Sequence, residues 1–222
     1  MYPNAAKGVK RIFISEILSL IAEIGAIVAI ITTLLSIATA ASESEVDPVV
    51  GIFASDAYVG LTVTGLVTII AAVLAVIAFI MQLVGIVNAS KDEGAFKISL
   101  FAVIASIVFT IIGGFFPQTS IVSKIFSALT TLSQLFVTVF IIQGIINLAK
   151  KIGNSAVEKK GNTLLKIIAC IYIISVIIYI VTGIIGGAPI IANVLSIGSS
   201  VLQIVAYLLF LSVLSNAKKM LA

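Results

Sequence analysis

Six apolar runs dominate the sequence, and each is long enough to cross a lipid bilayer as a helix. They cover residues 12–41, 57–87, 96–116, 121–148, 164–185 and 190–215. A bilayer core of about 30 Å requires about 20 helical residues, whereas a transmembrane strand shows an alternating polarity that these runs lack. We therefore predict an all-α fold, a polytopic bundle of six transmembrane helices that forms a single domain over residues 1–222.

The composition excludes a soluble protein. Hydrophobic residues make up 61% of the chain and charged residues 10%, against about 45–50% and ~25% in soluble domains. The absence of histidine and the single cysteine remove the usual ligand sets for zinc, haem and iron–sulfur clusters. The sequence contains no phosphate-binding glycine loop, HExxH motif or paired cysteines. We expect no enzyme activity, no cofactor or metal and, because the basic residues are scattered between apolar runs, no nucleic-acid partner.

The charged residues predict the orientation. All but one of the 13 Lys and Arg residues lie on one side of the predicted helices, and the exception is Lys124. The opposite side instead contains Glu43, Glu45, Asp47 and Asp56. The positive-inside rule therefore places both termini in the cytoplasm. We expect an integral protein of a prokaryotic plasma membrane that contacts the lipid bilayer, with anionic headgroups at the cytoplasmic face.

An internal repeat emerges when the chain is shifted by 69 residues against itself. The matches are Lys97 with Lys166, Ser106 with Ser175, Gly114 with Gly183, Ser127 with Ser196, Gln134 with Gln203, Asn147 with Asn216 and Lys150 with Lys219. The first hairpin follows more loosely, through the Lys10 to Ser19 step and the Asn88 to Lys91 exit. We predict three hairpins, over approximately residues 10–91, 97–150 and 166–219, related by a pseudo-threefold axis along the membrane normal. The alternative is chance similarity among Ile-rich helices.

Two carboxylates, Glu16 and Glu23, distinguish the first apolar run, since no other run contains an acidic residue. They share one helical face with Ser19, at the spacing i, i+3 and i+7. A carboxylate at bilayer depth is costly and indicates a functional site by default, here one for a proton or a cation. The alternative for Glu23 is a permanently neutral carboxyl group that holds helices together through hydrogen bonds. The predicted repeat aligns Ser19 with Ser106 and Ser175, Glu23 with Thr110 and Tyr179, and Glu16 with Val103 and Tyr172.

The two carboxylates differ in their expected depth. Glu16 follows Lys10 and Arg11 closely and can pair at the interface. Glu23 is ~18 Å along the helix from Arg11, and we expect it to be buried and protonated because no basic residue is expected beside it. Its predicted partners are the mid-helix amides of Gln134 and Gln203. The small side chains of Ala22, Ala26 and Ala29 allow the first helix to approach its neighbour closely.

Polar residues also occur outside the first apolar run. Ser127, Thr131, Gln134 and Thr138 form a stripe at helical spacing that either lines a water-filled path or holds helices together. Residues 150–166 are predicted to form a solvated basic loop. Asn88, Asn147 and Asn216, each followed three residues later by Lys, are predicted to end helices, with Asn in the left-handed conformation.

Two hypotheses for the function follow. The first is a small transporter or channel, with Glu23 as the proton or cation site and Gln134 and Gln203 in its lining. The second is a non-catalytic membrane subunit or scaffold, whose polar stripes fasten hairpins together or dock a second copy or a membrane partner protein.

Overall fold

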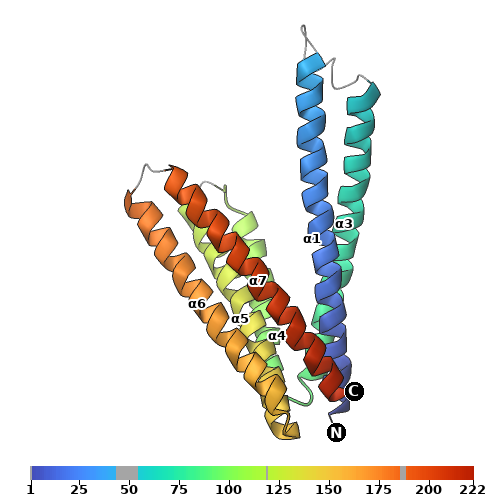
Figure 1. Ribbon diagram of the computed structural model, residues 1–222, viewed down its shortest axis with the longest axis vertical. Helices are drawn as coiled ribbons and strands as arrows, with labels where there is room; N and C mark the ends of the chain where they lie inside the picture. Colours follow the sequence, from blue (N-terminus) through green and yellow to red (C-terminus); the bar gives the residue numbers. More distant parts are fainter. Residues whose placement is uncertain (1, 44–54, 119, 186–188) are drawn as a thin grey trace. The chain divides into compact units, whose positions relative to one another are not determined.

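The computed structural model is all-helical over the residues that it describes, which are 2–43, 55–118, 120–185 and 189–222 (Figure 1). Six helices follow one another in this part of the chain: α1 Pro3–Glu43, α3 Ser55–Ala89, α4 Ala95–Gly114, α5 Ile121–Ile152, α6 Ser155–Ile185 and α7 Pro189–Leu221. These residues contain no strand, and the predicted all-α fold is confirmed. Side chains are described for residues 2–36, 38, 62–118, 120–174, 202 and 204–222.

Five helical segments among the described residues are long and apolar enough to cross a membrane. They are Pro3–Ser36, Thr62–Ala89, Ala95–Gly114, Ile121–Ile152 and Ile204–Leu221. The first helix begins at Pro3, earlier than the apolar run alone predicts. Proline suits a first helical position because its fixed φ is already helical and it has no N–H to leave unpaired.

The chain forms two compact units. The base unit comprises Met1–Phe13 and Leu83–Ala222, and the hairpin unit comprises Ile14–Gln82. Both boundaries therefore fall inside continuous helices, α1 and α3. The single domain and the three hairpin repeats stay predictions.

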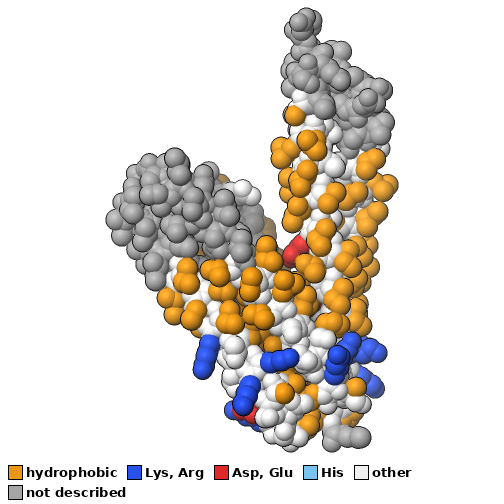
Figure 2. Space-filling model, viewed as in Figure 1, with side chains coloured by type: hydrophobic (Ala, Val, Ile, Leu, Met, Phe, Trp, Pro, Cys, Tyr) orange, Lys and Arg blue, Asp and Glu red, His pale blue; other side chains and the backbone are white. Residues whose placement is uncertain are grey.

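The base unit has an apolar core to which every helix contributes. Its fully buried side chains include Val9, Ile12, Ile86, Phe96, Ile141, Ile145, Leu164 and Leu214. Both chain termini lie at one end of this unit (Figure 1), and Lys and Arg side chains gather at the same end (Figure 2). We call this the basic end; it consists of the start of α1, the α3–α4 and α5–α6 turns and the end of α7.

Two glycines allow α1 and α3 to touch through their backbones in the base unit. A Cβ on Gly8 would lie 2.5 Å from the carbonyl oxygen of Gly85 and 2.6 Å from the backbone nitrogen of Ala89. A Cβ on Gly85 would lie 2.8 Å from Cγ1 of Ile12. Such small residues permit close helix crossing in membranes, where dispersion contacts replace the hydrophobic effect as the source of helix association.

The hairpin unit is built from small residues inside and large ones outside. Ala22, Ala29, Ala71 and Ala78 are buried between α1 and α3, whereas Ala26, expected on the same face, is exposed. Large apolar side chains cover the outside, among them Ile30, Leu34, Leu66 and Ile69, each at least 60% exposed. A surface of this kind suits lipid rather than water.

The predicted basic loop over residues 150–166 is wrong. α5 continues to Ile152 and α6 begins at Ser155, so only Gly153 and Asn154 separate them. Gly153 has φ 78°, and its N–H and that of Asn154 bond to carbonyls of the last turn of α5. Asn154 then accepts a hydrogen bond from the Val157 N–H at 3.1 Å and caps α6. A left-handed glycine followed by an Asn cap ends one helix and starts the next within two residues.

The predicted left-handed Asn caps are also wrong. No residue other than glycine has a positive φ in the described part of the chain. Asn147 and Asn216 lie inside α5 and α7, and Asn88 lies in the last turn of α3. Their side chains are therefore available for contacts other than capping.

Candidate functional site

Glu16 is a buried carboxylate within the hairpin unit. Its exposed fraction is 8%, and its Oε1 accepts a hydrogen bond from Nε2 of Gln82 at 2.9 Å. Glu16 belongs to α1 and Gln82 to α3. We call the buried alanines that hold these helices close together, Ala22, Ala29, Ala71 and Ala78, the alanine face. Ser15 beside it is also buried. The predicted site residue Glu16 thus has a hydrogen-bonding partner, Gln82, that is not among the predicted site residues.

Glu23 differs from Glu16, two turns further along α1. Its side chain is exposed where burial was expected, and Ser19 between them is half-buried. Within the described residues of the hairpin unit no side chain bonds to the Glu23 carboxylate. Its predicted partners, Gln134 and Gln203, belong to the base unit. Among the described side chains of the hairpin unit, Glu16 is therefore an enclosed carboxylate and Glu23 an open one.

The other predicted site residues mostly bond within their own helices. Ser106 donates to the Val103 carbonyl at 2.7 Å, and Thr110 donates to the Ser106 carbonyl at 2.8 Å. On α5, Thr131 bonds to the Ser127 carbonyl and Thr138 to the Gln134 carbonyl, while the Gln134 side chain is exposed. The side chains of Ser175, Tyr179 and Gln203 lie outside the described residues.

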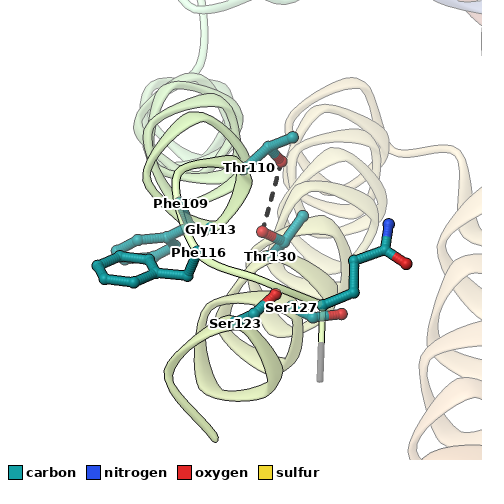
Figure 3. A pocket seen from close by; sticks show the side chains of 9 residues that line it. Phe109, Thr110, Gly113, Phe116, Ser123, Ser127 and Thr130 are labelled. Atoms are coloured by element: carbon teal, nitrogen blue, oxygen red, sulfur yellow. Dashed lines mark hydrogen bonds between the residues drawn. The ribbon is translucent and has the colours of Figure 1, made fainter. Parts of the chain in front are cut away.

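A pocket of about 300 Å³ lies between the end of α4 and the start of α5 (Figure 3). Thr110 and Thr130 point toward each other across it, with their hydroxyl oxygens 3.4 Å apart. Its lining also includes Phe109, Gly113, Gly114, Phe116, Gln118, Ser123 and Ser127, none of them charged. Of the predicted site residues, the pocket contains Thr110 alone. It is far along the chain from either carboxylate and offers neutral hydroxyls rather than an ion site.

Sequence reasoning missed a cluster at the basic end, around two acidic residues in the α3–α4 turn. Asp92 accepts hydrogen bonds from the Asn4 side chain at 3.0 Å and the Ala5 N–H at 2.8 Å. Burial works to raise the pKa of Asp92, but hydrogen bonds from Asn4 and Ala5 outweigh it and hold this pKa below its ordinary value. Asp92 thereby fixes the start of α1 to the turn.

Glu93 fixes the same turn to α5. One carboxylate oxygen of Glu93 accepts a hydrogen bond from Nδ2 of Asn147 at 3.0 Å, and the other accepts one from Nζ of Lys151 at 2.6 Å. Burial again works to raise the pKa, but the bonds and charge of these partners outweigh it and lower the pKa of Glu93. The Lys151 ammonium also lies 5.9 Å from the Tyr2 ring, and Gln143 bonds to Asn147. The available signal was an Asp-Glu pair in the middle of basic residues, immediately before a helix.

These features define the chain as a multi-pass membrane protein, with several apolar helices, lipid-facing surfaces and a basic end. Comparisons with models of protein families, with curated proteins and with solved structures gave no match to the chain.

Proposed function

We propose that the chain is a small transporter or channel whose first hairpin carries a proton- or cation-responsive carboxylate. The observation that carries this proposal is the pair of carboxylates on one helix, with Glu16 buried against Gln82 and Glu23 exposed two turns away. A buried carboxylate such as Glu16 can hold a proton or a cation, and an exposed carboxylate such as Glu23 can exchange it with water or with another polar group. Gln134 in the base unit offers an exposed amide of the kind such a path needs.

A second candidate is a non-catalytic membrane subunit or scaffold that packs against a partner protein or a second copy. The internal bonds of Thr131 and Thr138 favour it, because a stripe already satisfied within its own helix needs no water-filled path. In either case we propose that the protein is not an enzyme. We also propose a prokaryotic plasma membrane, with cytoplasmic termini and contact with anionic headgroups; the basic end supports the last two.

Flux measurements in proteoliposomes distinguish these candidates. We expect the native chain to dissipate an imposed proton or monovalent-cation gradient, and Glu16→Gln and Glu23→Gln to reduce this flux strongly. Glu158→Gln is the matched control. The Glu158 carboxylate lies on α6 at the basic end and forms a loose ion pair with Lys150, with 3.9 Å between Oε1 and Nζ. Full flux in both hairpin variants, or none in the native chain, would contradict the transport proposal and favour the scaffold.

A further inference from the structure

We propose that Glu16 and Gln82 form a proton-binding site, in which the Gln82 amide keeps the Glu16 carboxyl hydrogen-bonded with and without its proton. The inference deepens the proposed function, and the role of the site in transport rests on that function. It is carried by the contact between the two side chains and by the residues that occupy the corresponding positions of the other hairpins.

The predicted repeat places apolar residues where the first hairpin has this polar pair. The corresponding pairs are Val103 with Ile141 and Tyr172 with Phe210. Three of these four side chains are buried, and the tyrosine is half-buried. Glu16 is therefore buried at a position where the second hairpin has a buried apolar residue, and the half-buried Gln82 lies beside it.

Several positions near this level have the same burial in all three aligned hairpins. Three aligned positions are buried in all three hairpins. The first is Gly85, Gly144 and Val213, the second is Ile86, Ile145 and Leu214, and the third is Ala89, Leu148 and Ala217. Lys10, Lys97 and Lys166 are exposed in all three. The positions of Gln82, Ile141 and Phe210 lie one turn from the first of these sets, on the same helix faces.

Packing alone does not require a polar pair at this position. Apolar side chains fill the corresponding positions of the second and third hairpins. Burying the Glu16 carboxyl group instead costs desolvation free energy, of which the hydrogen bond from the half-buried Gln82 returns about 0.6 kcal/mol. A polar pair at an otherwise apolar core position therefore points to binding.

The chemistry of the amide favours a proton as the ligand. When Glu16 is ionised, Nε2 of Gln82 donates to its Oε1, as the structure shows. When a carboxylate oxygen takes up a proton from water, the new O–H can donate to the Gln82 carbonyl oxygen while Nε2 still donates to the other carboxyl oxygen. Both states keep their hydrogen bonds, and the proton returns to water on release. A lysine partner would instead hold the carboxylate in its charged state.

The ionisable groups near Glu16 include Lys218 of α7, whose Nζ lies 4.5 Å from the ring centre of Phe13, three residues before Glu16. From α3, the helix that packs against α1 in the hairpin unit, no Asp, Glu, Lys or Arg is available between Asp56 and Lys91. On α1 itself the nearest ionisable residues are Arg11 and Glu23. Glu16 is therefore the carboxyl group whose protonation the Gln82 amide can accompany.

Infrared difference spectroscopy of the full chain in lipid, across a pH titration, tests the site without requiring transport. We expect a carboxylic acid C=O band that is lost in Glu16→Gln, shifted in frequency in Gln82→Leu, and retained in the controls Glu23→Gln and Glu158→Gln. A native spectrum that Glu16→Gln does not change would overturn the proton site.

A swap variant and the flux assay separate the two proposals. Glu16→Val with Gln82→Ile copies the second hairpin and is expected to fold with undiminished thermal stability but to lose the band and the proton flux; native-like flux in this variant would also overturn the site. If it fails to fold, Glu16→Gln, which keeps an amide partner for Gln82, supplies the comparison. A native chain that shows the band but no flux contradicts transport and leaves the proton site standing. Flux that persists in Glu16→Gln and disappears in Glu23→Gln contradicts the site and leaves transport standing.

Discussion

The helices of the two compact units associate through different kinds of buried side chain. At the basic end of the base unit, fully buried side chains such as Ile86, Phe96 and Ile145 fill the core. In the hairpin unit the buried side chains are small or polar, including Ala71, Ala78 and Thr64. One interior resembles that of a soluble protein, and the other that of a pair of membrane helices.

Two general sources of helix association correspond to these two interiors. Where large apolar side chains leave water on folding, their burial stabilises the fold by ~25 cal/mol per Å². Within the bilayer lipid is as apolar as leucine, so helices associate through close packing and hydrogen bonds instead. The hairpin unit therefore depends on few contacts, mainly between small buried residues such as Ala71 and Ala78. Three substitutions test this difference, from the largest expected effect to the smallest.

The largest effect is expected from a methyl group at the α1–α3 crossing. In Gly8→Ala the new Cβ overlaps backbone atoms of Gly85 and Ala89, which cannot move without displacing α3. We expect a loss of about 3 kcal/mol in the free energy of unfolding, measured by denaturation in detergent micelles.

Gly65→Ala is the matched control in the hairpin unit, because a Cβ there meets nothing within 4 Å. Alanine is favoured over glycine in helices by about 1 kcal/mol, so this variant is expected to be as stable as the native chain or more stable. Equal destabilisation by the two substitutions would refute the distinction between a tightly packed base and an open hairpin surface.

The second effect comes from the acidic turn at the basic end. Glu93→Gln removes a carboxylate that bonds to Asn147 and Lys151. Because Lys151 is partly in solvent, we expect a loss of about 1 to 2 kcal/mol of unfolding free energy. Glu158→Gln, whose carboxylate pairs loosely with Lys150, is expected to change it by less than about 0.5 kcal/mol.

The pH dependence of this second effect has a defined sign. The pKa values of Asp92 and Glu93 are lowered in the folded chain from ordinary values of 3.8 and 4.5. Their stabilisation is therefore complete above those values and is lost as the pH falls through the lower folded values. Unfolding measured over this acid range should show a smaller pH dependence in Glu93→Gln; an unchanged dependence would exclude Glu93 as a source of it.

The sequence predicted the parts of this structure that depend on one helix at a time. Apolar runs located the helices, and Glu16 stood out as a charge in an apolar run. Its partner Gln82 could not be identified, because that requires the rotation and register of α3 against α1, which the alanine contacts determine. The short α5–α6 turn, in contrast, was readable from Gly153 and Asn154, but the surrounding lysines favoured a loop.

The smallest effect tests whether a hydroxyl pair contributes to the hairpin unit beyond its internal bonds. Thr32 donates to carbonyls of its own helix and also lies 2.8 Å from the Thr64 hydroxyl of α3. A double-mutant cycle of Thr32→Val and Thr64→Val should give a coupling of about 0.6 kcal/mol, the average for such pairs in membranes. Thr33 bonds to the Ala29 carbonyl, within α1, so a cycle of Thr33→Val with Thr64→Val should give no coupling. If both cycles give zero, the Thr32 and Thr64 hydroxyls contribute nothing to the association of α1 with α3 beyond the close packing of small residues.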